Sequence, residues 1–285
     1  MTSIFTILGL AVTIILFVFF NHATGFEFNS FSLFFIIPIG GLFVGAGSSV
    51  GLFSGLLFTN KPVNRNHYLL GAALGFIAFW GIYYVSYITT YIDTKGEVNY
   101  SFQGEAISNY EIEGEEISFS KFLNISKNTE SQFFFHGRPI GDGIDTGGGF
   151  GNFMFYLHLI AAMLAGAFVG LSIVGDKNYC GRCKKYMKEK TLFKFELDRY
   201  EEIADRLLEN KDQLEGLRSI IKSTELKDKE VKSFVQTDLE YCPSCHDSRM
   251  LIKIFNLSGS NFEEATQFRK YIVVIDKVSK GLLIN

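Results

Sequence analysis

The stretch FMFYLHLIAAMLAGAFVGLSIVG, residues 153–175, contains no Asp, Glu, Lys or Arg. An α-helix rises about 1.5 Å per residue, so roughly 20 apolar residues cross a bilayer core about 30 Å thick. Three further uncharged runs of this kind lie at 4–20, 31–58 and 68–91. The sequence therefore predicts a multi-pass α-helical membrane protein with four transmembrane helices, three of them within 1–91.

The composition agrees with a chain whose first half lies in lipid. Of the 285 residues, 47% are hydrophobic and 30 are Phe, whereas 20% are charged. Residues 176–285 hold 21 of the 27 Lys and Arg. These figures exclude disorder, a collagen-like fibre, a disulfide-dense secreted scaffold and a soluble enzyme occupying the whole length. The formal net charge of -3 makes nucleic acid an unlikely general partner.

The first run is interpreted as a membrane anchor rather than a cleaved signal peptide. It lacks a basic N-terminal region, and no small-x-small cleavage site precedes residues 21–24.

Basic residues predict the orientation, because Lys and Arg near span ends stay on the cytoplasmic side. Lys61 and Arg65 follow the second span, and a basic cluster follows the fourth. Its members are Lys177, Arg182, Lys184, Lys185, Lys188 and Lys190. Residues 92–152 carry mainly acidic charge and are expected on the opposite face. Both termini are then cytoplasmic, and the Ile, Phe, Asn and Lys content suggests a bacterial cytoplasmic (inner) membrane.

Small residues four apart predict where the helices meet, because helices in lipid associate through close backbone approach. The candidate packing residues are Gly41 and Gly45; Gly47, Gly51 and Gly55; Gly71 and Gly75; and Ala162, Gly166 and Gly170. Contacts within the bundle or within a homo-oligomer are the favoured interpretation. The alternative is a pore or hinge in which Pro38 bends the second span.

Two spans share a short pattern. Residues 41–45 (GLFVG) and 166–170 (GAFVG) differ at one position. Duplication of a helical hairpin and chance similarity both explain this match.

His158 is the strongly ionisable side chain within the predicted spans. Such residues are candidates for proton transfer or ligand binding. The favoured interpretation is a neutral imidazole that is hydrogen-bonded to a neighbouring helix.

Residues 92–152 are too many for a simple connection and predict a small extracytoplasmic α+β domain. Alternation over 109–119 predicts a hairpin, residues 120–125 a short helix, and 132–135 another strand.

The Gly-rich stretch 137–151 contains Asp142 and Asp145 and is loosely similar to calcium-binding loops. A flexible lead into the fourth span is favoured, and no ligand is assigned.

All four cysteines lie in residues 176–285, in two C-x2-C knuckles at 180–183 and 242–245. A reducing compartment disfavours disulfides. Four thiolates form the tetrahedral ligand set of zinc and leave no open position for a catalytic water. We therefore expect structural zinc on Cys180, Cys183, Cys242 and Cys245.

These knuckles resemble those of the zinc ribbon family, and Cys242-Pro243-Ser244-Cys245 has that family's common C-P-x-C form. The resemblance implies a cytoplasmic zinc-ribbon-like α+β domain over 176–285. The family usually has Gly after each knuckle, where this chain has Lys184 and His246, and 58 residues separate Cys183 from Cys242.

Strands are predicted at 191–196, 250–257 and 271–276. Between the knuckles, apolar residues recur at helical spacing from Leu197 to Leu208 and from Leu214 to Ile221, which predicts a helical insert over 197–240.

Three other uses of this region rank lower. They are a rubredoxin-like iron site, a thioredoxin-type redox pair, and nucleic-acid binding by the lysines at 184–190. Membrane topology and contact with anionic lipid explain those lysines better.

No nucleotide-binding, protease or hydrolase motif is present, so an enzyme is not expected. The favoured function is a non-enzymatic membrane scaffold or sensor that couples the extracytoplasmic domain to the zinc module and recruits a cytoplasmic protein partner. The alternative is an oligomeric channel or effector, with a pore lined by Gly, Ser48 and Ser49 and the zinc module as gate or assembly platform. A membrane-bound enzyme ranks third.

Overall fold

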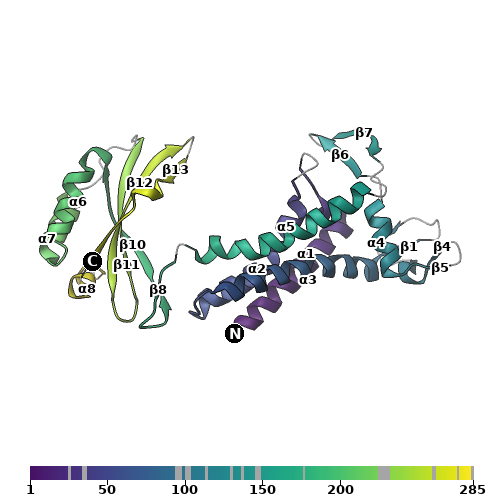
Figure 1. Cartoon of the computed structure of the whole chain (residues 1–285), viewed down its shortest axis with the longest axis horizontal. Coiled ribbons are helices and arrows are strands. Elements are labelled where there is room, and N and C mark those ends of the chain that lie inside the picture. Colours follow the sequence, from purple (N-terminus) through teal and green to yellow (C-terminus); the bar gives the residue numbers. More distant parts are fainter. Residues whose placement is uncertain are drawn as a thin grey trace. The chain divides into compact units, whose positions relative to one another are not determined.

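The chain divides into two units, Met1–Asp176 and Lys177–Asn285, in the computed structural model (Figure 1). The structure describes residues 1–24, 27–33, 37–93, 98–99, 104–112, 115–128, 131–135, 138–144, 149–175, 177–223, 232–258, 261–274 and 276–283.

Four long helices dominate the first unit: α1 (Thr2–Thr24), α2 (Ile39–Phe58), α3 (Arg65–Thr89) and α5 (Gly149–Val174). Each is long and apolar enough to cross a membrane, as the sequence predicts.

Helix α2 lies between α1 and α5 and meets both through glycines. A Cβ atom on Gly45 would lie 1.9 Å from the carbonyl oxygen of Ala162 on α5. One on Gly51 would lie 2.1 Å from the carbonyl oxygen of Phe5 on α1. The other candidate packing glycines also lie at contacts within the chain: Gly41 against α5, Gly47 and Gly55 against α1, Gly71 and Gly75 against α5, Gly166 against α3, and Gly170 against the Phe53 ring.

Pro38 does not bend a span, so the hinge alternative is wrong at this residue. Helix α2 begins immediately after it, and the Pro38 carbonyl accepts the N–H of Leu42 at 3.1 Å. Proline is tolerated there because N–H groups at a helix start lack intrahelical acceptors. Residues 31–33 and 37–38, predicted as part of the second span, instead form the connection before α2, after the short 3-10 helix η1 (Phe28–Ser30).

Caps define the turn from α2 to α3. Asn60 has a left-handed φ of 52°, and the N–H of Lys61 reaches back to the carbonyl of Leu56 at 2.9 Å. Asn64 then starts α3, because its side chain accepts the N–H of His67 while His67 Nδ1 accepts the N–H of Asn64 at 3.1 Å. This reciprocal capping box was not predicted, since His rarely occupies that position.

The segment between α3 and α5 contains short strands and one helix: β1 (Tyr91–Ile92), β2 (Val98–Asn99), β3 (Glu105–Ala106), η2 (Ile107–Asn109), β4 (Glu111–Ile112), β5 (Glu115–Glu116), α4 (Phe119–Asn128), β6 (Ser131–Phe135) and β7 (Arg138–Ile144). The predicted hairpin is confirmed by the β4–β5 pairing, and the predicted helix and third strand are confirmed as α4 and β6. Ile117, Phe122 and Leu123 share one buried core with Phe79 of α3 and Phe155 of α5.

The predicted flexible lead into the fourth span is wrong for residues 138–144. They form β7, which pairs antiparallel with β6. Backbone pairing thus overrides the weak strand preference of Gly and Asp. Asp145 lies outside the described residues, and α5 begins at Gly149.

The second unit is built on an antiparallel sheet. Its strands are β10 (Lys188–Glu196), β11 (Ser233–Tyr241), β12 (Ser248–Ser258), β13 (Asn261–Glu264) and β14 (Lys270–Val274). The order is β10-β11-β12-β13, and β14 pairs with the first half of β12 while β13 pairs with the second. A separate small hairpin joins β8 (Tyr179–Cys180) to β9 (Lys185–Tyr186).

One face of this sheet carries the core of the unit. Helices α6 (Tyr200–Glu209), α7 (Leu214–Ser223) and α8 (Asp276–Leu283) supply Ile203, Leu207, Leu217, Ile220, Val278 and Leu282 to it. Short 3-10 turns, η3 (Leu197–Arg199) and η4 (Thr266–Phe268), connect these elements.

The helical insert ends earlier than predicted. Helices α6 and α7 confirm its helical part, but residues 233–240 belong to strand β11. Val235 and Leu239 point into the core, while Asp238 and Glu240 are buried on the opposite face. Charged residues at alternate positions are typical of exposed segments, and the sequence alone does not show their ionic partners.

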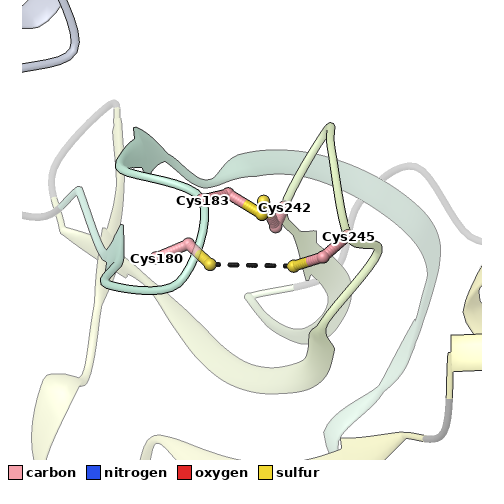
Figure 2. Close-up of side chains that lie close together, drawn as sticks. All are labelled: Cys180, Cys183, Cys242 and Cys245. Carbon is pink, nitrogen blue, oxygen red and sulfur yellow. Dashed lines mark hydrogen bonds between the residues drawn. The ribbon is translucent and has the colours of Figure 1, made fainter.

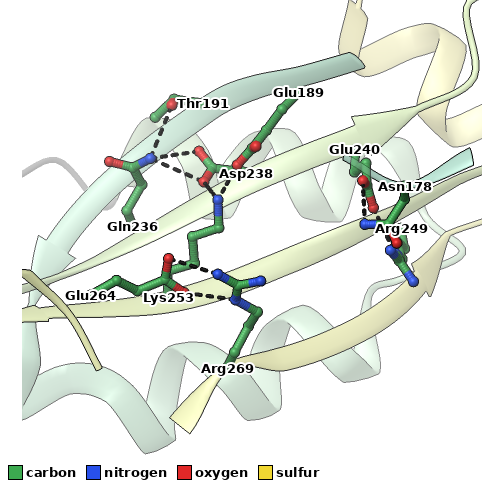
Figure 3. A network of polar contacts seen from close by, with 10 residues as sticks. All are labelled: Asn178, Glu189, Thr191, Gln236, Asp238, Glu240, Arg249, Lys253, Glu264 and Arg269. Atoms are coloured by element: carbon green, nitrogen blue, oxygen red, sulfur yellow. Dashed lines mark hydrogen bonds and ion pairs between the residues drawn. The ribbon is translucent and has the colours of Figure 1, made fainter. Parts of the chain in front are cut away.

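Those partners form a polar network on the second face of the sheet (Figure 3). Lys253 pairs with Glu189 and lies 2.9 Å from Asp238, whose side chain has no exposed surface. The amide of Gln236 donates to both oxygens of Asp238, at 2.9 and 3.0 Å, and to the hydroxyl of Thr191. The buried carboxylate is therefore neutralised by a side chain from the neighbouring strand.

Replacing Gly45 tests the close contact of α2 with α5. Gly45→Val places side-chain atoms where the Ala162 carbonyl lies, so the helices must separate, and we expect a loss of about 3 kcal/mol in stability. Gly149→Ala is the control, because a Cβ there meets no atom within 4 Å. Thermal unfolding in detergent measures both, and equal melting temperatures for the two variants would contradict the packing role.

Lys253→Met tests the ionic network. It leaves the buried Asp238 carboxylate without its cation and is expected to cost about 3 kcal/mol. The control is Lys270→Met, since Lys270 is 52% exposed and its pair with Glu201 spans 4.0 Å, for which less than about 1 kcal/mol is expected. Hydrogen exchange of β11 and β12 reports the change; similar exchange in both variants would show that the network does not stabilise the sheet.

Candidate metal centre

The first knuckle is the turn of the β8–β9 hairpin. Cys180 pairs with Lys185 and Tyr179 with Tyr186, and the two tyrosine rings lie 5.2 Å apart. Lys184 closes the turn with a φ of 53°. The hairpin therefore holds Cys180 and Cys183 on the same side of a tight turn.

The second knuckle is the loop between β11 and β12. The N–H of Cys242 donates to the carbonyl of Asp247, and the N–H of His246 donates to the carbonyl of Cys242, both at 2.9 Å. His246 has a φ of 62°. Lys184 and His246 thus adopt the left-handed conformation that favours glycine, the residue that zinc ribbons usually have there. Both positions therefore have a glycine-like φ without being glycine.

Strand pairing explains how knuckles far apart in sequence meet. Lys188 at the start of β10 pairs with Tyr241 at the end of β11, and Tyr241 also pairs with Ser248 at the start of β12. Residues before β10 and after β11 consequently lie at one end of the sheet. The long insert leaves from the other end of β10 and returns into β11, so its length does not separate the knuckles.

The four cysteine sulfurs converge (Figure 2). All Sγ atoms lie within 4.8 Å of one another, and those of Cys180 and Cys245 are 3.7 Å apart. A tetrahedral site with metal–sulfur bonds of about 2.3 Å requires sulfurs about 3.8 Å apart. A disulfide requires about 2.0 Å, so the cysteines are free thiols in a geometry that fits one metal ion.

Hydrogen bonds near the cysteines join the two knuckles to each other and join the residue before β8 to the sheet. Lys185 Nζ donates to the hydroxyl of Ser244 at 2.8 Å. Asn178 donates to Glu240 at 2.7 Å, and Glu240 accepts from Arg249 (Figure 3). Cys180 and Cys242 are buried, whereas Cys183 and Cys245 are half-buried. These hydrogen bonds could not be predicted from the sequence, because each joins residues from different segments of the chain.

The thiols titrate very differently without a cation. Burial opposes ionisation of Cys242, but N–H groups of Cys245 and Ser244 donate to its sulfur and lower the pKa of Cys242 to about 7. The hydrogen bond to Cys245, followed by burial, raises the pKa of Cys183 to about 12. One thiolate therefore forms readily and disfavours the next, and a divalent cation would remove this mutual repulsion.

His158 lies in the first unit and is separate from this centre. It is buried on α5, where Nδ1 accepts the N–H of Gly41 at 3.3 Å and Nε2 lies 2.9 Å from the Ser32 hydroxyl. Because Nδ1 is an acceptor, Nε2 carries the proton and donates to Ser32. This arrangement is that of a neutral imidazole that links α5 to α2.

Ser48 and Ser49 are also buried. Ser48 donates to the carbonyl of Gly45 at 2.9 Å, and Ser49 donates to that of Gly71 at 3.0 Å. Within one chain, the Ser48 hydroxyl therefore bonds within α2 and the Ser49 hydroxyl bonds to α3.

Glycine substitution tests the left-handed turn positions. Lys184→Gly and His246→Gly should each stabilise the metal-bound unit by about 1 kcal/mol, because they remove an unfavourable backbone conformation. Lys188→Gly, in strand β10, is the control and should destabilise by roughly 0.5–1 kcal/mol. Competition with a coloured chelator measures metal retention; weaker retention in Lys184→Gly than in Lys188→Gly would contradict this account.

Comparison with known proteins adds no relative to this geometry. No family model, curated protein or solved structure matches the chain. The centre consists of four cysteine sulfurs, from two hairpin turns, that lie close enough together to hold one ion.

Proposed function

We propose that this protein is a non-enzymatic membrane scaffold or sensor whose second unit carries structural zinc and recruits a protein partner. The observation that carries the proposal is the convergence of four thiols in a unit that directly follows four membrane-length helices. Four sulfur ligands complete a tetrahedral shell and leave no position for substrate or water. Such an ion stabilises a fold rather than catalysing a reaction.

Membrane insertion is supported by the outer surface of the bundle. Large apolar side chains are exposed on each of its helices, among them Ile15, Phe43, Leu69 and Phe168. A soluble protein rarely exposes so much contiguous apolar surface. We propose a bacterial cytoplasmic membrane for the bundle, with the second unit and both termini inside the cell, because Lys61, Arg65 and the basic cluster after α5 flank the spans and such residues stay on the cytoplasmic side.

Zinc is preferred over iron as the bound ion. Both accept four thiolates, but zinc imposes no geometric preference and requires no electron-transfer partner. Close to the sulfurs, Lys185 donates a hydrogen bond to Ser244 and so joins the two knuckles. The described residues contain no second cluster of metal ligands.

Metal analysis and partner capture test the proposal. The purified protein should contain one zinc per chain and show no iron–thiolate absorption. Cys245→Ser removes one ligand and should lower zinc affinity at least tenfold and abolish capture of a soluble protein from lysate in mild detergent. Ser244→Ala is the matched control, since it keeps all four sulfurs.

Three results would contradict the proposal. They are a chain that contains iron, a chain that binds no metal, and a zinc-bound chain that captures the same proteins as Cys245→Ser.

A further inference from the structure

Several basic residues lie close together in the sequence around the first knuckle. Lys177, Arg182, Lys184 and Lys188 are exposed, and none has an ion-pair partner among the residues that the structure describes. We call these four residues the knuckle cations.

Cations elsewhere in the unit are largely neutralised. Arg249 pairs with Glu240, Lys253 with Asp238, and Arg269 makes two hydrogen bonds to Glu264. Arg199, Arg206, Arg218 and Lys270 also lie beside glutamates. Lys190 donates to the carbonyls of Leu282 and Leu283 at the end of α8. Lys194, Lys211, Lys222 and Lys232 also have no ion pair among the described residues, but they are spread along the unit, whereas the four knuckle cations fall within residues 177–188.

Acidic residues offset this charge only in part, and one of them, Asp176, directly precedes Lys177. Residues 177–188 contain none, Glu189 pairs with Lys253, and the second knuckle adds the exposed Asp247. A bound Zn²⁺ with four thiolates carries two negative charges, but its sulfurs are partly buried. The tip at Gly181 is open, because a Cβ there meets no atom within 4 Å.

The covalent connection limits how far the knuckle cations lie from lipid. Helix α5 ends at Val174, and Arg182 follows eight residues later. An extended chain of that length spans at most about 28 Å. Lys177 is three residues from the helix end. Positive side chains tethered so close to a span are within reach of the negative headgroups of the same leaflet.

We propose that the β8–β9 hairpin docks on anionic lipid headgroups, with the knuckle cations as its contact residues. Charge complementarity supplies the attraction. Arg182 and Lys184 lie in the hairpin turn, Lys177 precedes β8, and Lys188 is the first residue of β10. The inference rests on the proposed function, in that it takes the helices of the first unit to cross a membrane. Each basic residue near an anionic surface is worth about fivefold in association, and salt screens the effect.

The test uses the full chain in nanodiscs of phosphatidylcholine, with and without phosphatidylglycerol. On discs with phosphatidylglycerol, hydrogen exchange of residues 179–188 should slow roughly tenfold. Raising the salt from about 0.15 M to about 1 M should abolish the protection. Arg182→Gln, Lys184→Gln and Lys188→Gln combined should abolish it as well. The control combines Lys211→Gln, Lys222→Gln and Lys232→Gln, which makes the same charge change away from the knuckle and should keep the protection.

Metal analysis of the same samples separates this inference from the proposed function. A zinc-bound chain that shows equal exchange on both kinds of disc overturns lipid docking alone. Protection by added single-stranded RNA, in place of phosphatidylglycerol, also overturns it and assigns the cations to nucleic acid. A chain that lacks zinc but is protected by phosphatidylglycerol overturns the metal assignment and supports the docking.

Discussion

Apolar side chains cover the outside of the helical bundle as well as its inside, and this constraint governs the first unit. In lipid, burying one more apolar side chain between helices gains little, so helices adhere where their backbones approach closely. Glycines provide that approach on two faces of α2, toward α1 and toward α5. The polar groups that remain, such as His158 and the hydroxyls of Ser48 and Ser49, are used in contacts between or within helices. The described bundle is thus consistent with lipid as its solvent.

The second unit is stabilised in a different way. Helices cover one face and form an apolar core, while the other face buries charges in matched pairs. The cysteine centre lies at the sheet end where β10, β11 and β12 meet. The centre joins the β8–β9 hairpin to the loop between β11 and β12. Few polar contacts, such as that of Lys185 with Ser244, join these two segments otherwise.

Features with a local or periodic signature could be predicted from the sequence. The four spans, the helices between the knuckles and the grouping of the four cysteines follow from hydrophobic runs, helical spacing and metal-ligand chemistry. Strand β11 could not, because its buried charges depend on Lys253 and Arg249 of the next strand. The position of Pro38 before α2 and the pairing of β7 with β6 likewise depend on where the chain turns, which composition does not specify. Helix α8 was not predicted, because it is short and because the preceding strand was predicted to extend to Asp276, where α8 begins.

The register of β10 with β11 has an evolutionary consequence. Both knuckles lie at the end of the sheet where β10 begins and β11 ends, and the chain between Glu196 and Ser233 leaves and returns at the opposite end. Changes in the length of that segment leave the spacing of the four sulfurs untouched as long as α6 and α7 still pack on the sheet, whereas a one-residue slip within β10 or β11 would separate the sulfurs. Ligand spacing counted along the sequence is therefore a poor criterion for recognising distant relatives of this centre; conserved strand pairing next to each knuckle is the better one.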